Sequence, residues 1–467
     1  MKYPLATVFW RLVFSCFLFA PLCLGAAESV AVQDENQQRL DTIRYGTESE
    51  IAALIQTLKS ERTGGIQTKS DEALDEALIR VTQNTRNQQI LSGVLGFFAD
   101  QDKKGLEERA IKAIEERDEE AHETVLSAIE YLGRVKSASA LAPLKTLLEA
   151  EESSFMGAAF RALGRVASGG NAQDKDDIAA YLVDFYTQRT PPDQSRREII
   201  QALGETGSKA GLSLLIELAG DNQERGALRM VALEGLSKIA DSSGLDPILE
   251  ALSSTDPNVR STAVAALGPF SGQAVDEAIL ESFRDAYYRT RIGAASAAGT
   301  RQLSEAIPYL QYRAERDEVP AVRDEAIKSL GAIGNAQALG VLERLLEDPK
   351  QPIRSRIKAA TMLLESDPSS YADKVIAQLD DAKKTHQTAL YNGFLGALGE
   401  AKTGKLEDLA RRFLDTGGIV EKSYALDMIL RNELRSLAPD VRPLATEEKN
   451  TGLARKAQNI LDHFGLN

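Results

Sequence analysis

The sequence predicts an all-α solenoid in which about a dozen antiparallel helix pairs stack in series. The first observation is a short phrase that returns about every 31 to 33 residues, with an arginine seven positions before a Leu-Gly or similar anchor. The second is that apolar residues between the anchors follow helical spacing. A repeat of this length is typical of stacked supersecondary units that share one continuous core. The repeated arginines are Arg196, Arg229, Arg260, Arg291, Arg323 and Arg354.

Residues 1–27 are predicted to be a signal peptide. Lys2 supplies a positive start, residues 12–24 are nearly all apolar, and Ala26 and Ala27 follow as small residues suited to cleavage. The apolar run is shorter than the roughly 20 residues that a membrane-spanning helix needs. We therefore expect an exported protein, in the periplasm or at the envelope surface, with no transmembrane span after cleavage.

Both cysteines of the chain, Cys16 and Cys23, lie inside this segment. The mature chain is therefore expected to contain no disulfide and no cysteine-ligated metal. A lipid anchor is the less favoured alternative, because Ser15 precedes Cys16 as in a lipoprotein signal, whereas the large Leu22 precedes Cys23.

The chain is acidic, with 55 Lys and Arg against 69 Asp and Glu and a net charge of -14. This charge argues against nucleic acid as a partner, since a phosphate backbone requires clustered basic residues. The acidic N-terminal third either attracts a basic partner protein or simply keeps a long exported chain in solution.

After the signal peptide, residues 28–48 are predicted to be a flexible leader and residues 49–467 the repeat solenoid. Longer intervals between anchors place loop insertions near residues 168–177 and 190–193, which are rich in Gly, Pro and polar residues. The second helix of each pair is expected to end near its anchor. These anchors are Leu95, Leu132, Leu163, Leu203, Leu236, Leu267, Ala298, Leu330, Thr361, Leu398, Ile429 and Ile460.

One repeat illustrates the predicted local structure. Residues 247–252 carry a first helix, and Asp256 then caps a second helix that has Pro257 at its first position, where a missing N–H costs nothing. Gly268 is expected to end the second helix, since a residue without Cβ turns the chain easily. The buried face is expected to comprise Val259, Ala263, Ala266 and Leu267.

Residues 256–268 (DPNVRSTAVAALG) and 320–334 (PAVRDEAIKSLGAIG) resemble the second-helix motif of HEAT repeats, including the HEAT-like group of the bilin lyases. The resemblance is strong over about 193–361 and weaker toward both ends, where other residues replace the arginine. It implies a right-handed superhelix of antiparallel pairs, with second helices lining a concave face that holds other proteins. The residues that stand in place of the repeated arginine toward the two ends are Val125, Met156, Tyr391 and Lys422.

The repeated arginines allow two interpretations. In the favoured one they form a structural ladder, each binding a carboxylate or a loop carbonyl of its own or an adjacent repeat. In the alternative they form a binding stripe, because a guanidinium presents a planar fork to carboxylates.

Catalytic motifs are few, and neither an enzyme, a metal site nor a cofactor is expected. The three histidines, His122, His386 and His463, fall in different repeats. The run 399–405 fits the spacing G-x-x-x-x-G-K, but Leu406 stands where a phosphate-binding loop needs Ser or Thr, and a helix is predicted before it.

The best candidate for binding is a cluster of aromatic and basic residues within about one repeat, since Tyr and Arg dominate protein-binding hot spots. Helix packing is the competing explanation for Tyr288 and Tyr309. The predicted binding residues are Tyr287, Tyr288, Arg291, Tyr309 and Tyr312.

These observations together predict a non-enzymatic scaffold of the cell envelope that binds a partner protein along a preformed concave face. The alternative is a lyase-like or chaperone-like accessory that presents a cofactor or a substrate protein for modification.

Overall fold

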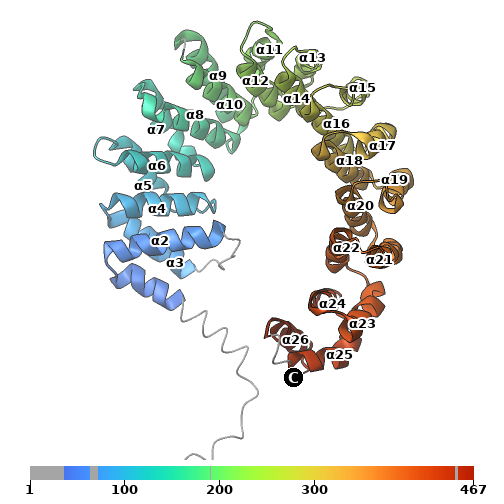
Figure 1. Cartoon of the computed structure of the whole chain (residues 1–467). Helices are drawn as coiled ribbons and strands as arrows, with labels where there is room; N and C mark the ends of the chain where they lie inside the picture. Colours follow the sequence, from blue (N-terminus) through green and yellow to red (C-terminus); the bar gives the residue numbers. More distant parts are fainter. Residues whose placement is uncertain (1–35, 64–71, 190, 447–450, 467) are drawn as a thin grey trace, which may run out of the picture. The chain divides into compact units, whose positions relative to one another are not determined.

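The computed structural model describes residues 36–63, 72–189, 191–446 and 451–466, and all regular structure in these ranges is helical. Figure 1 shows the helices in antiparallel pairs, which confirms the predicted all-α solenoid of about a dozen pairs. The predicted signal peptide, with both cysteines, and residues 28–35 lie outside the described ranges.

The helices form two compact units, residues 1–211 and 212–467, where the sequence predicts one solenoid over 49–467. In unit 1 the even-numbered helices pack on one another in series, and each odd-numbered helix packs on the even-numbered helix that follows it. Its labelled helices are α2 (Glu48–Thr63), α3 (Glu72–Asn84), α4 (Gln88–Ala99), α5 (Glu107–Glu115), α6 (His122–Arg134), α7 (Leu141–Glu149), α8 (Ser153–Ser168), α9 (Ala172–Arg189) and α10 (Asp193–Thr206).

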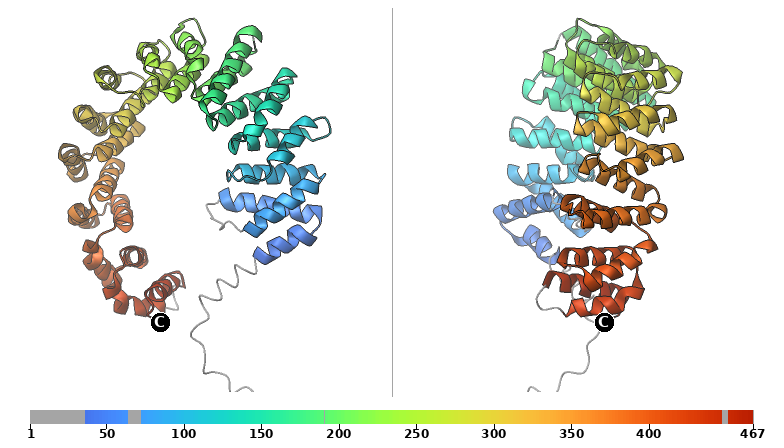
Figure 2. Two further views of the ribbon diagram at one scale, coloured as in Figure 1. Left: turned by 180° about the vertical axis from the view of Figure 1, so that it is seen from behind. Right: turned by 45° about the vertical axis from the view of Figure 1, so that its right-hand side comes forward.

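Unit 2 has the same pairing, and within it the even-numbered helices form the inner row of an arc while the odd-numbered helices form the outer row (Figures 1 and 2). Its helices are α11 (Leu212–Gly220), α12 (Gly226–Ile239), α13 (Leu245–Ala251), α14 (Pro257–Ala266), α15 (Gln273–Ser282), α16 (Tyr288–Thr300), α17 (Ile307–Arg316), α18 (Pro320–Ile333), α19 (Ala336–Glu347), α20 (Ile353–Ser366), α21 (Pro368–Lys384), α22 (Thr388–Glu400), α23 (Glu407–Thr416), α24 (Ile419–Arg431), α25 (Ala438–Ala445) and α26 (Thr451–Phe464).

The predicted leader over 28–48 is wrong from residue 36 onward, because residues 36–45 are helical. Leu40 and Ile43 of this segment are buried, and Arg39 forms an ion pair with Glu61 at 2.8 Å. Two apolar side chains one helical turn apart supply enough buried surface to dock this short helix.

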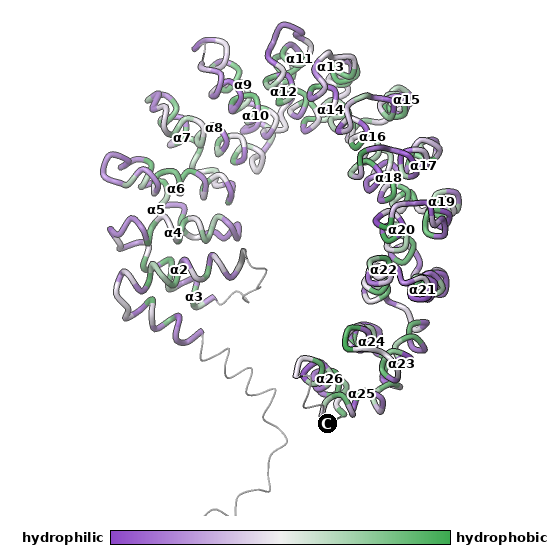
Figure 3. Tube along the Cα trace, viewed as in Figure 1, coloured by the Kyte–Doolittle hydropathy of each residue, from purple (hydrophilic) through white to green (hydrophobic). Residues whose placement is uncertain are grey.

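The core consists of the apolar stripes that the helices turn toward one another, and Figure 3 shows them alternating with polar stretches along the chain. The predicted anchors belong to this core: all of them except Thr361 are buried. In that repeat the fully buried leucine is Leu363, so the anchor lies two positions later than predicted.

The capping predicted for the second helix at 257–266 is present. The Asp256 side chain accepts a hydrogen bond from the Asn258 N–H at 2.8 Å, and Pro257 is the first residue of α14. This helix ends at Ala266, before Gly268, as predicted.

In most other repeats the second helix ends near its anchor, as predicted, but it continues one to four residues past the anchor glycine. Gly164 lies inside α8, and a Cβ there would come within 2.8 Å of the Cα of Ala202 in α10. Gly299 lies inside α16, where a Cβ would come within 2.9 Å of the Cα of Ser329 in α18. These glycines therefore allow neighbouring second helices to approach closely, rather than turning the chain.

Candidate functional site

The repeated arginines connect successive repeats of unit 2. Arg260 binds both carboxylate oxygens of Asp285 at 2.7 and 3.0 Å, and Arg291 binds those of Asp317 at 2.8 and 2.9 Å. Each aspartate lies in the turn before the next second helix. Each arginine also donates to a carbonyl of its own turn, from Arg260 to Ser254 at 2.8 Å and from Arg291 to Asp285 at 3.0 Å.

The aspartates also hold the backbone of their own turns. Asp285 accepts a hydrogen bond from the Tyr287 N–H at 2.7 Å, and Asp317 accepts one from the Val319 N–H at 3.0 Å. The Asp317 side chain has no exposed surface, and burial acts to raise its pKa. The hydrogen bonds from Arg291 and the Val319 N–H outweigh burial, so the pKa of Asp317 lies below its ordinary value.

Three of the other repeated arginines make related contacts with neutral acceptors. Arg196 donates twice to the hydroxyl of Tyr186, at 2.9 and 2.6 Å. Arg229 is buried and donates from Nε to the Ala219 carbonyl at 3.2 Å. Arg323 donates to the carbonyl of Asp317.

Arg354 makes the predicted contact with a carboxylate of an adjacent repeat, but at the surface rather than in a buried turn. Its side chain is 77% exposed, and it forms an ion pair with Asp324 at 2.5 Å. Arg356, which is only 4% exposed, donates from Nε to the Leu346 carbonyl at 2.9 Å, the counterpart of the contact that Arg229 makes. Arg356 precedes the buried Leu363 by seven positions, so the repeat phrase here has the predicted spacing but a register shifted by two residues.

Where the arginine is replaced, another polar side chain can make the link. Tyr391 donates its hydroxyl to Glu421 at 2.6 Å, and Glu421 also accepts from Lys383 at 2.7 Å and from the Gly418 N–H at 2.6 Å. Burial acts to raise the pKa of Glu421, but these three donors outweigh it and lower the pKa to about 2. The donors of the ladder thus point into the protein, which is the arrangement of a structural feature rather than of a ligand stripe.

The predicted tyrosine and arginine cluster separates into different environments. Arg291 is buried against Asp317 and is not accessible to a partner. Tyr287 and Tyr288 lie at the start of α16, where their rings meet edge to face at 5.3 Å and the Tyr287 hydroxyl donates to Asn258 at 3.1 Å.

Tyr309 and Tyr312 lie on α17 and line a groove of about 300 Å³ between α17 and the end of α15. Phe283, only 1% exposed, is part of its lining, and its ring stacks on Tyr309 with 5.6 Å between ring centroids. Tyr312 is 54% exposed. We call this the α15–α17 groove, and its lining residues are Phe283, Arg284, Pro308, Tyr309, Tyr312 and Arg313.

Two guanidinium groups border the α15–α17 groove. Arg284 lies 5.6 Å from the ring centroid of Tyr309, and Arg313 lies 5.3 Å from that of Tyr312. Phe283, Arg284 and Pro308 line the groove but are not among the binding residues predicted from the sequence. The sequence does offer one signal, because the aromatic Phe283 lies about one repeat length before the two tyrosines of α17. This spacing alone does not show which rings stack on one another.

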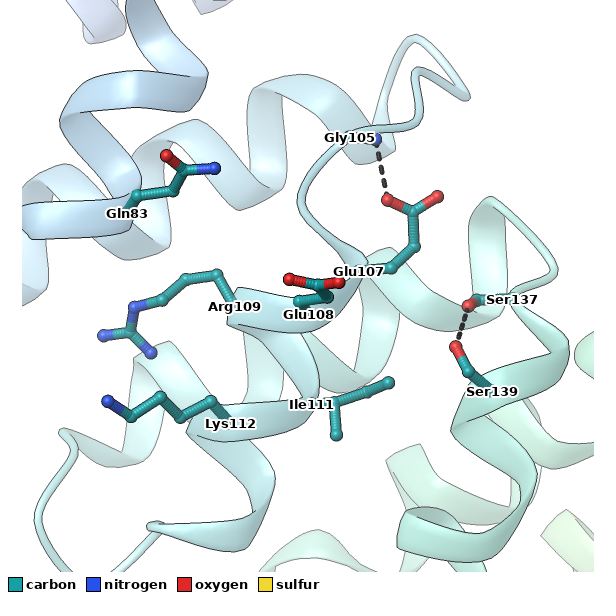
Figure 4. A pocket seen from close by; sticks show the side chains of 9 residues that line it. All are labelled: Gln83, Gly105, Glu107, Glu108, Arg109, Ile111, Lys112, Ser137 and Ser139. Carbon is teal, nitrogen blue, oxygen red and sulfur yellow. Dashed lines mark hydrogen bonds between the residues drawn. The ribbon is translucent and has the colours of Figure 1, made fainter.

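A second cavity, of about 720 Å³, lies in unit 1 beside α5 (Figure 4). Its lining mixes both charges: Arg109 and Lys112 extend side by side from α5, on the side of the cavity where Gln83 lies, while Glu107 accepts a hydrogen bond from the Gly105 N–H at 2.7 Å. Arg109 is already paired with Glu120 at 2.7 Å. This mixture of paired charges does not select a ligand of one sign.

Among the described residues, no group of three or more His, Cys, Asp and Glu side chains is placed to hold a metal ion. His122 stacks on Phe155, His463 contacts Glu433 at 3.0 Å, and His386 is exposed. The G-x-x-x-x-G-K run continues from α22 into a short 3₁₀ turn, Gly404–Leu406, in which Leu406 is buried. In the part of the chain that the structure describes, no helix has the length and apolar character needed to cross a membrane.

Comparison with protein families gives one match over most of the chain. The model of the family described as "Spirochaete HEAT repeat protein" matches residues 43–460. No curated protein matches the chain.

Solved structures with a similar fold include karyopherins. The chain matches Kap95 of the Kap95:Nup1 complex with a TM-score of 0.51 and 14% identity, covering 92% of this chain and 64% of that one. The match to Kap121p bound to Pho4p has a TM-score of 0.43 and 13% identity, covering 96% of this chain and 56% of that one. The chain therefore spans little more than half the length of Kap121p, and the likeness to Kap95 shows a shared helical fold.

Proposed function

Because the chain belongs to the spirochaete HEAT repeat protein family, we propose that it is a non-enzymatic scaffold that binds a partner protein. A stacked helical scaffold presents a surface that is ordered before binding, so association need not include the entropic cost of ordering loops. The observation that carries the proposal is the α15–α17 groove, where the exposed ring of Tyr312 borders an apolar lining. Aromatic side chains at an accessible apolar groove are typical of binding hot spots.

The groove moves the proposed binding surface from the concave face to the outer row of unit 2. Tyr309 and Tyr312 lie on α17, and α15 and α17 both belong to that outer row (Figure 2). Of the predicted binding residues, the inner-row helix α16 carries only Arg291 and the two tyrosines at its start. Arg291 is already paired with Asp317.

Two further observations support a binding role over a catalytic one. The carboxylates that link successive repeats, Asp285, Asp317 and Glu421, each accept hydrogen bonds from side chains of the protein itself. The histidines of the described residues make no contact with one another or with a nucleophile that would form a proton relay. These arrangements hold charges in place rather than exposing a reactive group.

We further propose that the scaffold works in the cell envelope. This part rests on the predicted signal peptide over residues 1–27. Cell fractionation with intact-mass measurement of the mature protein tests it: the expected result is a chain that begins near residue 27 or 28 in the envelope fraction. A chain that keeps Met1 and stays in the cytoplasm would contradict export, and a lipid mass on Cys16 or Cys23 would establish the anchored alternative.

Site-specific photo-crosslinking in the native host tests the binding role. A photo-reactive amino acid replaces Tyr312 in one variant and Ala377 in the control, since Ala377 is also exposed on an outer-row helix, α21. We expect a discrete, saturable adduct of higher mass from position 312 and none from position 377. Equal labelling at the two positions, or no adduct at position 312, would contradict the proposed scaffold function.

A further inference from the structure

We propose that the α15–α17 groove binds an extended acidic segment of a partner, with an aromatic side chain in the groove and a carboxylate on Arg284. This inference rests on the proposed scaffold function and names the chemical class of the partner. Its starting point is that all six lining residues are either apolar or aromatic, or are arginines, in a chain whose net charge is -14.

The apolar part of the groove suits one aromatic ring. Phe283 is fixed beneath it by burial, Tyr309 stacks on Phe283, and Pro308 and Tyr312 are exposed at its edge. A volume of about 300 Å³ is close to the lower limit for small-molecule pockets, which fits one large side chain rather than a whole cofactor. Offset or edge contacts between aromatic rings add to the stabilisation that comes from burying their area.

The two arginines differ in what they can offer a ligand. Arg313 donates to the Phe283 carbonyl and pairs with Asp317 at 3.2 Å, so its role is to hold α17 against the end of α15. Arg284 is 61% exposed, and its ion pair is with Glu281, which is 70% exposed. Exposed ion pairs of this kind contribute little to stability, so a ligand carboxylate can replace Glu281 at little cost.

The charge at the groove also argues against other occupants. A basic segment would meet the exposed guanidinium group of Arg284 at close range, and like charges brought together at an interface are costly. A proline-rich segment would use the aromatic rings but would leave Arg284 with its existing exposed partner. The acidic aromatic segment uses both the rings and the guanidinium, and it is therefore the occupant to which we commit.

Peptide binding to the purified full-length protein tests the inference. The probe is the fluorescein-labelled peptide Gly-Ser-Glu-Glu-Trp-Glu-Glu-Ser-Gly, measured by anisotropy. The comparison peptides replace all Glu by Gln, all Glu by Lys, or Trp by Ala, and a fifth peptide is proline-rich and neutral. We expect saturable binding of the acidic Trp peptide alone, in the range of about 10–500 µM, weakened by added salt.

Protein variants locate the binding. Tyr312→Ala is expected to weaken the acidic Trp peptide about tenfold or more, and Arg284→Gln about two- to fivefold with a smaller dependence on salt. The control is Arg411→Gln on α23, because Arg411 is similarly exposed and is paired with Glu407 on its own helix, with Asp440 of α25 at 3.9 Å. Circular dichroism checks that each variant keeps the helical content of the parent.

Each other outcome overturns the inference. Absence of saturable binding at about 1 mM, equal binding of the Gln and Glu peptides, or tighter binding of the proline-rich or Lys peptide would each exclude the acidic class. Equal weakening by Arg411→Gln would exclude the groove as the site. If these results came with a crosslink from position 312, the scaffold function would stand and only the partner class would fall; loss of the crosslink as well would remove both.

Discussion

The two arginines at the start of α20 give the sharpest test of how the repeats are linked. Arg354 follows the predicted repeat spacing, yet its side chain is 77% exposed; Arg356 is only 4% exposed. Arg356 donates to the Leu346 carbonyl at 2.9 Å and to Gln378 at 2.8 Å, which ties α20 to the end of α19 and to α21. We predict that Arg356→Ala strongly lowers the free energy of unfolding and that Arg354→Ala hardly changes it.

The magnitude follows from these contacts. Arg356→Ala leaves the Leu346 carbonyl without its side-chain donor and removes the packing of the arginine stem. An unsatisfied buried acceptor costs about 1–3 kcal/mol, and the lost packing adds to that. Burial lowers the pKa of Arg356, which shows that the buried charge itself carries a cost, so removing it offsets part of the loss. We therefore expect a net loss of about 2–3 kcal/mol, against about 0–1 kcal/mol for Arg354→Ala, whose ion pair is at the surface.

Urea denaturation followed by circular dichroism measures both variants, with the slope of the transition compared as well as its midpoint. Arg356→Met is the control, because it keeps most of the side-chain packing while removing the donors. A loss of stability for Arg354→Ala equal to or larger than that for Arg356→Ala would refute the shifted register in this repeat.

Three further predictions follow from individual contacts. Ser254 occupies the same turn position as the aspartates Asp285 and Asp317, and it accepts a long hydrogen bond of 3.5 Å from the buried Arg229. Ser254→Asp should supply a carboxylate to Arg229 and raise the free energy of unfolding in urea by about 0.5–2 kcal/mol. A destabilised variant would contradict the equivalence of these turns. Gly164→Ala should lower the melting temperature, because its Cβ would lie 2.8 Å from the Cα of Ala202. The control is Gly220→Ala, since Gly220 is half-buried but has open space around its Cβ. Because folding lowers the pKa of Glu421 from 4.5 to about 2, its contribution to the free energy of unfolding is complete above pH 4.5 and is lost as the pH falls toward 2. Glu421→Gln should remove up to about 3 kcal/mol of this acid-dependent stability. An unchanged pH profile of unfolding would count against the hydrogen-bond network around Glu421.

Much of the architecture can be predicted from the sequence because each repeat repeats the same local physics. An apolar residue that returns at helical spacing must face the core in every copy, and this is why anchors such as Leu203 and Leu330 are buried as predicted. The Asp256 cap and Pro257 also depend only on their immediate neighbours.

The misplaced details depend on contacts between repeats, which spacing along the chain does not determine. Arg354 and Arg356 are two positions apart on one helix, and only the packing of Leu363 shows which of them turns inward. From the sequence alone, an anchor glycine such as Gly164 is equally compatible with ending a helix and with allowing a neighbouring helix to approach closely. Which role it has depends on how near the next second helix lies.

The binding residues were the least predictable part. A cluster that is compact in sequence was expected to be compact in space, but in a stack of helix pairs the start of α16 and the outer side of α17 belong to different rows (Figure 1). The side chain of Arg291 does not lie with the tyrosines, because it is buried in an ion pair with Asp317, 26 positions later in the sequence. Phe283 and Arg284 joined the groove because the end of α15 packs beside α17.

Hydrogen–deuterium exchange of the full chain, alone and with the protein captured at position 312, tests the central claim that a partner binds the outer row of unit 2. We predict slower exchange at the end of α15 and along α17, where Phe283 and Tyr312 lie, and no change in α25 and α26. Protection confined to the inner-row helices α14, α16 and α18 would contradict the claim and return the binding surface to the concave face.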